Sequence, residues 1–358
     1  QIKKWGKFHM PVAVIKGLDL KNHEKINFEI VKPVELPKLE MTGKKDIDLS
    51  RIKEKVNIIY RENSFITLIG KGKIPITLPR YIKVNADLIE LFYLIHGDGH
   101  YQNKLYFVNK DPELHRFVIN KFEEIFKVPK SLWRARLLIS DLSNSTDAID
   151  YWKRELELED LQFYPTASQC LLKTSEVGNL RIAIDKTIVS VVFRFIFNRL
   201  QILDRKDSLH ALNGLLCAEG SPEKNKRGLH KITISFSQKE KNMFREILNK
   251  TEIGYSAIML RDRFVIRKWN NLYQFFKIFF SNNITPFSLH HQRCKNALGG
   301  FLNHSFTQTM CKYLTILKKG HNFTTKELIN ITGYRPESML STLRKSQYSK
   351  FIKIGVGE

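Results

Sequence analysis

Two acidic residues, each at the end of an apolar segment, are the side chains of this sequence whose spacing could do chemistry. Residues 91–99 read LFYLIHGDG and residues 212–220 read LNGLLCAEG. Each segment is typical of an apolar helix that stops at a small residue, an acid and a glycine. A carboxylate at a helix C-terminus is electrostatically unfavourable, because the helix dipole is negative there. The repetition of this arrangement at Asp98 and Glu219 therefore predicts a shared metal site.

The chemistry that such a pair suggests is phosphodiester hydrolysis. A divalent metal held by carboxylates activates water, neutralises the phosphate and stabilises the leaving oxygen. Mg²⁺ keeps several waters, so one carboxylate from each segment is enough. Gly97 and Ala218, just before the acids, would let the two helix ends approach each other. The alternative is that both acids are plain surface residues that precede a glycine.

The two segments resemble the motif of the LAGLIDADG homing endonucleases, in the single-chain form with two motifs. The resemblance implies an α+β fold, in which two tandem αββαββα repeats form a saddle about a pseudo-two-fold axis. It also implies that Asp98 and Glu219 bind Mg²⁺ or Mn²⁺, and that a monomer cuts both strands of DNA across a minor groove. Tyr93 stands where the family usually has glycine or another small residue, which predicts looser packing of the motif helices there.

A basic side chain near the acids would stabilise the transition state of the cleavage. By their position at the end of the last strand of each repeat, Lys186 and Lys268 are the catalytic candidates. The alternative for both is a solvated surface lysine.

The balance of charge indicates a polyanionic partner. The chain has 59 basic and 36 acidic residues, a formal net charge of +23, and nucleic acid is the commonest partner of such a chain. Basic and polar residues also alternate along the expected strands, although they could simply be the wet side of an antiparallel sheet. The candidate nucleic-acid-binding residues are His100, Gln102, Lys104, Tyr106, Arg134, Arg136, Lys231, Thr233, Ser235, Arg261, Arg263 and Arg267.

Periodicity predicts two units built on the order α-β-α-β-β-α, the first with a further helix between its last two strands. The first unit is expected as a helix capped by Asn85 or Asp87, a strand 100–108, a helix 112–126 opened by Asp111-Pro112, a strand 132–139, a helix 148–158, a strand 180–185 and a helix or strand 187–200. The second is expected as a helix capped by Ser208, a strand 229–237, a helix 239–250, a hairpin 255–269 and a helix 271–280.

These elements divide the chain into four predicted parts. Residues 1–85 read as a β-leaning accessory region, residues 86–205 and 206–305 as the two repeats, and residues 306–358 as three short helices and a strand. The last part resembles a winged helix-turn-helix, which would enter a major groove. The alternative is a helical cap that packs on the second repeat.

Three functions remain open at this point: a site-specific DNA endonuclease, a non-cleaving DNA-binding regulator, and an RNA maturase or RNA-processing factor with the same fold. The acid pair favours cleavage, and the C-terminal part favours regulation. Four cysteines without C-x-x-C spacing favour free thiols in a reducing compartment, the cytoplasm or an organellar matrix, and we expect neither secretion nor a membrane span. His290, His291 and Cys294 are a weaker alternative as zinc ligands.

Overall fold

The computed structural model describes residues 46–304, apart from short gaps at 53–55, 62, 71–74, 160–161, 165, 171–173, 202 and 259–261. The winged-helix-like part predicted at 306–358, residues 1–45 and Arg261 lie outside the described residues. The described part of the accessory region is built of strands, as expected. It holds a three-stranded antiparallel sheet of β2 (Val56–Arg61), β3 (Phe65–Gly70) and β4 (Ile76–Pro79), and a short ladder of β1 (Ile47–Asp48) with β5 (Tyr81–Ile82).

The first half of the molecule, residues 86–200, is a five-stranded sheet with helices. Its elements are α2 (Ala86–Asp98), β6 (Gly99–His100), β7 (Leu105–Asn109), α3 (Pro112–Phe126), β8 (Trp133–Ile139), α4 (Ser145–Leu156), β9 (Ser168–Gln169), β10 (Asn179–Ile184) and α5 (Thr187–Leu200). The strand order is β6-β7-β10-β8-β9, and all neighbours are antiparallel except β8 and β9.

The second half, residues 205–302, is a four-stranded antiparallel sheet with helices. Its elements are α6 (Arg205–Glu219), β11 (Gly220–Asn225), β12 (Gly228–Ser235), α7 (Lys241–Thr251), β13 (Ser256–Ile258), β14 (Arg263–Arg267), α8 (Trp269–Ser281) and α9 (His291–Leu302). The strand order is β11-β12-β14-β13.

Two strands, not one, follow each of the helices α2 and α6, so the pattern-based order was wrong at this point. In the first half the strand expected over 100–108 is a hairpin, because the polar residues 102–104 form the turn between β6 and β7. In the second half β11 has the sequence GSPEKN, whose proline and polar residues give almost no strand signal. Such a strand is tolerated because β11 is at the sheet edge.

Side-chain caps begin α2, α3 and α6, with one correction to the prediction. Asn85 caps α2 by accepting a hydrogen bond from the Leu88 amide at 2.9 Å, and Asp111 caps α3 as expected. Ser208 is not a cap: α6 begins earlier, and the side chain of Asp204 accepts from the Asp207 amide at 2.7 Å. Among the described residues, no helix is long and apolar enough to cross a membrane.

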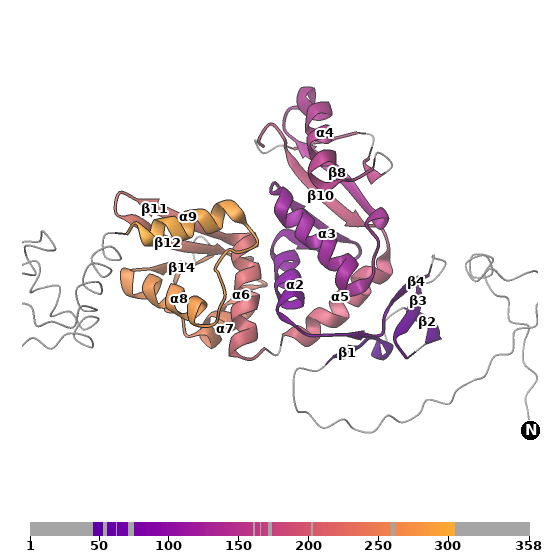
Figure 1. The fold of residues 1–358 in the computed structure, drawn as a ribbon, viewed down its shortest axis with the longest axis horizontal. Helices are drawn as coiled ribbons and strands as arrows, with labels where there is room; N and C mark the ends of the chain where they lie inside the picture. The colour runs from indigo at the N-terminus through magenta and orange to yellow at the C-terminus, as the bar shows by residue number, and fades with distance from the viewer. Residues whose placement is uncertain are drawn as a thin grey trace, which may run out of the picture.

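Helices α2 and α6 lie side by side at the centre, with one sheet on either side (Figure 1). Their backbones come close at Gly214, where an added Cβ would lie 2.5 Å from the Glu90 carbonyl oxygen and 3.2 Å from the Tyr93 Cβ. The prediction of looser packing at Tyr93 was therefore wrong. The glycine on α6 makes room for Tyr93, whose ring turns away and whose hydroxyl donates to the Leu200 carbonyl at 3.3 Å.

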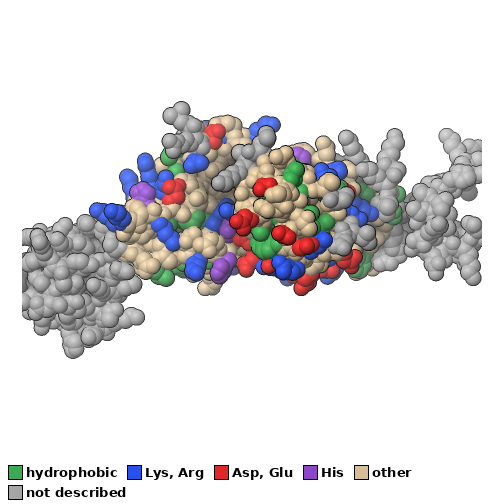
Figure 2. Space-filling model, turned by 90° about the horizontal axis from the view of Figure 1, so that it is seen from above, with side chains coloured by type: hydrophobic (Ala, Val, Ile, Leu, Met, Phe, Trp, Pro, Cys, Tyr) green, Lys and Arg blue, Asp and Glu red, His purple; other side chains and the backbone are tan. Residues whose placement is uncertain are grey.

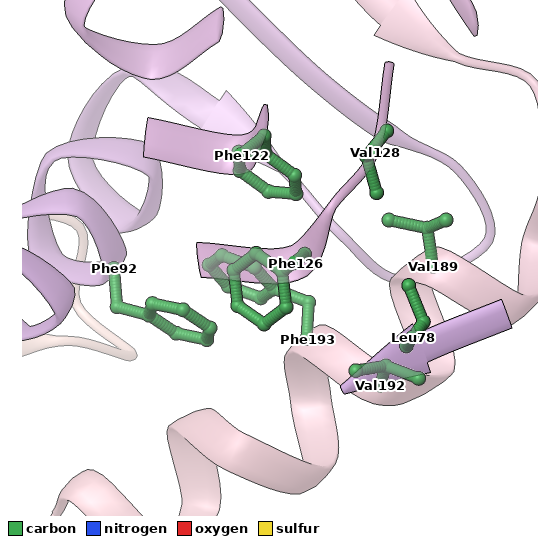
Figure 3. Close-up of a pocket in the computed structure, with 8 residues that line it drawn as sticks. All are labelled: Leu78, Phe92, Phe122, Phe126, Val128, Val189, Val192 and Phe193. Atoms are coloured by element: carbon green, nitrogen blue, oxygen red, sulfur yellow. The ribbon is translucent and has the colours of Figure 1, made fainter. Parts of the chain in front are cut away.

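One small cavity in the first half is lined only by hydrocarbon side chains. The cavity has a volume of about 10 Å³ and lies between α2, α3, α5 and β4, and Figure 3 shows the side chains that line it. Such a volume is at the lower limit for a single water, and the walls offer no polar partner. The cavity is thus a packing gap rather than a ligand site. Its lining residues are Leu78, Phe92, Phe122, Phe126, Val128, Val189, Val192 and Phe193.

Candidate metal and nucleic-acid site

The structure brings the two acids together. Asp98 is the last residue of α2 and Glu219 is the last residue of α6. The helix ends touch through the residues before the acids, since a Cβ on Gly97 would lie 2.5 Å from the Ala218 Cβ and 3.3 Å from the Glu219 Cγ. Only a glycine fits at position 97, as the small residues of the sequence suggested. Two carboxylates from different halves therefore meet at one junction.

Electrostatics at this junction disfavour two free negative charges. Burial and the charge of Glu219 raise the pKa of Asp98 to about 7, although Arg293 and a hydrogen bond from Asn109 act in the opposite direction. The Asn109 Nδ2 donates to the Asp98 Oδ2 at 2.7 Å. Burial and the charge of Glu240 likewise raise the pKa of Glu219, against the effect of Arg293 and His96. A cation bound between the acids would relieve this cost.

The donor set fits a hard divalent cation better than zinc. Within the described residues, no group of three or more His, Cys, Asp or Glu could hold a metal ion. Two carboxylates at a half-buried junction are the kind of sparse, all-oxygen site that Mg²⁺ or Mn²⁺ accepts while it keeps waters. The suggested zinc cluster does not form, because the His290 Nδ1 lies 2.9 Å from the Asp111 Oδ2 instead.

Sequence analysis missed Arg293, the basic residue that acts on both acids. Its Nη1 donates to the carbonyl oxygens of Cys217 and Ala218 at 2.5 and 2.6 Å, in the last turn of α6. It comes from α9, a helix that the sequence pattern did not predict. No local signal marks this arginine, because its partners are backbone carbonyls more than seventy residues away.

The halves are also joined by three histidine–carboxylate contacts. These are Glu90 with His210 at 2.7 Å, His96 with Glu240 at 3.1 Å, and Asp111 with His290 at 2.9 Å. In each pair one residue belongs to the first half and one to the second. Burial would raise the pKa of Glu240, but the His96 contact and hydrogen bonds from Ser237 outweigh it and lower that pKa to about 2. Glu240 is thus a fixed negative charge near Glu219.

Strand register places most of the predicted basic and polar residues of the first half on one sheet face. His100 pairs with Tyr106 across β6 and β7. Tyr106 is aligned through Ala183 of β10 with Arg134 of β8, and Arg136 lies two residues further along β8 on the same face. Arg181 of β10, which sequence analysis did not select, lies directly opposite Arg136. The guanidinium of Arg136 packs 4.2 Å from the ring centroid of Tyr164. The guanidinium of Arg181 lies 5.3 Å from the ring centroid of Tyr106.

Two of the predicted DNA-contacting residues of the first half lie in a turn and not on a strand. Gln102 and Lys104 are exposed between β6 and β7, so they do not belong to the strand face. The Lys104 Nζ lies 3.1 Å from the Asp185 Oδ1.

The second sheet presents a comparable face. Lys231 pairs with Arg267 and Ser235 with Arg263 across β12 and β14, and Thr233 pairs with Val265 between them. Arg263 and Arg267 are exposed, whereas Thr233 is buried. Seen from above, Lys and Arg side chains gather at the left of the molecule, over the second half, and Asp and Glu side chains gather nearer the middle (Figure 2).

The structure does not bring the two candidate lysines to the acids. Lys186 and Lys268 immediately precede α5 and α8. In the first sheet Gly99, the residue after Asp98, is aligned through Phe107 with Ile182 of β10. Lys186 lies four residues beyond Ile182, a distance of about 13 Å along an extended chain. Lys268 has the same offset in the second half, since Gly220 is aligned through Ile234 with Phe264. A catalytic role of these lysines stays a prediction.

Comparison with known proteins gives a similarity of fold. No protein-family model and no curated protein matches the chain. The crystal structure of the N-terminal LAGLIDADG domain of DUF199/WhiA is 14% identical with a TM-score of 0.33, over 54% of this chain and 81% of that one. A structure of I-DmoI with its target DNA and Mn is 13% identical with a TM-score of 0.31, over 57% of this chain and 97% of that one. The chain is thus structurally similar to LAGLIDADG domains over about half of its length.

Proposed function

We propose that the protein is a site-specific, divalent-metal-dependent DNA endonuclease of the LAGLIDADG type. In this proposal residues 86–205 and 206–305 are two repeats about a pseudo-two-fold axis, and the chain acts as a monomer. The observation that carries the proposal is the meeting of Asp98 and Glu219 at the contact of two packed helices. A protein that only binds DNA has no need to hold two repelling carboxylates at such a junction.

Each part of the site would have a distinct task. Asp98 and Glu219 would hold Mg²⁺ or Mn²⁺, which supplies an activated water and neutralises the phosphate. Asn109 holds one oxygen of Asp98 by a hydrogen bond and so fixes the direction of the other oxygen. The basic faces of the two sheets would grip the DNA backbone on either side of the acids and place a phosphate over them.

The first half's sheet face also offers aromatic rings. Tyr106 and Tyr164 lie beside Arg181 and Arg136, which keeps the two guanidinium groups extended over the sheet. Arginines held in this way are suited to bidentate contacts with phosphates or guanine edges. Duplex DNA is accordingly the proposed partner, and the predicted module at 306–358 would provide a second DNA contact.

A non-cleaving DNA-binding regulator is the second candidate. Arg293 favours it, because this residue already supplies a positive charge to both acids. Free thiols at Cys170, Cys217 and Cys294 support a reducing compartment in either case.

Selection from a randomised duplex library separates the two candidates. Bound duplexes are recovered in EDTA, and Mg²⁺ is then added. An endonuclease releases cut fragments with a defined sequence, and Asp98→Asn retains the same duplexes uncut. Recovery of a defined sequence that stays intact in Mg²⁺ would establish the regulator, and preferential recovery from an RNA library would establish the RNA-processing function.

A further inference from the structure

The first turn of α9 touches both halves of the molecule beside the acid pair. His290, immediately before α9, lies 2.9 Å from Asp111 of the first half. Arg293, three residues later, donates to the carbonyls that end α6 in the second half. Asp111 in turn donates its backbone amide to the Asn109 side chain, which binds Asp98. α9 is therefore fixed to the surroundings of both acids.

The guanidinium of Arg293 lies at the end of α6, where negative charge is concentrated. The end of α6 concentrates negative charge from its free carbonyls and from Glu219, and Asp98 adds a second carboxylate. The guanidinium binds two of those carbonyls and acts electrostatically on both carboxylates. A divalent ion held by the same carboxylates would occupy the same negative region.

We propose that Arg293 is a built-in counter-cation of the acid pair, which balances Asp98 and Glu219 before metal binds and thereby lowers their affinity for a divalent ion. This inference rests on the proposed metal site. Arg293 is a positioning residue in this account, because it fixes the charge and the helix end that the metal meets. Metal would then bind well only when DNA phosphates complete the site, so the free protein would stay empty of metal.

Binding of Mn²⁺ to the DNA-free protein tests the proposal, with electron paramagnetic resonance to measure free Mn²⁺. Arg293→Met removes the charge, and Arg293→Lys keeps it while losing the paired carbonyl contact. Lys295→Met is the matched control, because Lys295 is an exposed cation of the same helix. We expect Arg293→Met to bind Mn²⁺ at least about tenfold more tightly, since a fixed charge a few ångströms away no longer repels the ion. Arg293→Lys and Lys295→Met should stay within about twofold of the unmodified protein.

The outcomes separate this inference from the proposed function. If Arg293 only caps α6, Arg293→Met lowers thermal stability and leaves Mn²⁺ affinity unchanged or weaker, which overturns the proposal. Asp98→Asn in the Arg293→Met background should abolish the gain in affinity. Equal Mn²⁺ binding with and without Asp98→Asn would instead refute the metal site itself. Absence of Mn²⁺ binding by both Arg293→Met and the unmodified protein would also contradict the counter-cation.

Discussion

At the scale of single residues, the acid pair combines two carboxylates whose charged forms are disfavoured by burial and by a neighbouring negative charge, that of Glu219 for Asp98 and that of Glu240 for Glu219. The pKa of Asp98, raised to about 7, lies well above that of an aspartate in the unfolded chain. The folded protein therefore binds a proton that the unfolded chain releases, and this contribution to stability is lost as pH rises from about 4 to about 7. A carboxyl with such a raised pKa is typical of a functional site, here one that would bind a cation.

Asp98→Asn should remove the loss of stability that the Asp98 carboxyl causes as pH rises. In EDTA the unmodified protein should be less stable at pH 8 than at pH 5 by on the order of 3 kcal/mol from this group, and the variant should lack this difference. Urea unfolding at both pH values measures it, with Asp150→Asn as the control at an exposed carboxylate. Identical pH dependence of the free energy of unfolding in all three proteins would show that the Asp98 charge is not strained.

The identity of the acids could be predicted from the sequence because helix, acid and glycine are neighbours in the chain. Arg293 and Asn109 could not, because each acts on its partner only after distant segments have packed. Lys186 and Lys268 follow the last strand of each half, but strand register leaves them four residues along the sheet from the positions aligned with Gly99 and Gly220. Their catalytic role stays a prediction.

At the scale of elements, the contact of α2 with α6 depends on glycine. A side chain at Gly214 would meet the backbone of α2, which cannot move without displacing the helix that ends in Asp98. The close approach of the helices and the position of the acids are thus one structural property.

Gly214→Ala should destabilise the protein by about 2–3 kcal/mol, because an added methyl group overpacks this contact. Gly299→Ala is the matched control, since Gly299 lies in α9 with no atom near its missing Cβ. That change should instead stabilise by about 0.5–1 kcal/mol through helix propensity. Urea unfolding of both variants measures the two effects, and equal effects of the two substitutions would contradict the described helix contact.

The sheet faces give a prediction about DNA affinity. Arg263→Ala should weaken DNA binding and reduce the slope of log affinity against log salt by about 1, because one phosphate contact is lost. Arg245→Ala is the control, since Arg245 is exposed on α7 rather than on the strands. Fluorescence anisotropy with labelled duplex at several salt concentrations provides both slopes. An equal loss for both variants would mean that binding follows net charge and not this face.

At the scale of the whole molecule, α2 and α6 are each followed by two antiparallel strands, and the strand order β6-β7-β10-β8 corresponds to β11-β12-β14-β13. Helix α4 and strand β9 have no counterpart in the second half, and α9 has none in the first. Periodicity predicted the helices and the inner strands, because these have strong apolar faces. It missed β6 and β11, which are short or polar edge strands held by pairing with β7 and β12. It also missed α9, whose place depends on stacking of Phe301 with Trp269 and Phe276.

Side-chain and helix contacts join the two halves at the site. Three histidine–carboxylate pairs and the glycine contact of α2 with α6 span the junction at which the acids lie. The sequence predicted two similar units and a shared site, but no local pattern connects residues such as Glu90 and His210, which are 120 positions apart. The joint between the halves is therefore a property of the folded chain.

Cleavage of DNA that carries the native locus tests the central claim most directly. Supercoiled plasmid is incubated with Mg²⁺ and the unmodified protein, Asp98→Asn or Glu219→Gln, while binding of the same DNA is measured in parallel. We expect linear product with short 3′ overhangs from the unmodified protein, and undiminished binding without cleavage from both variants. Tight, sequence-specific binding without any cleavage by the unmodified protein would contradict the account, as would cleavage that survives the loss of both carboxylates.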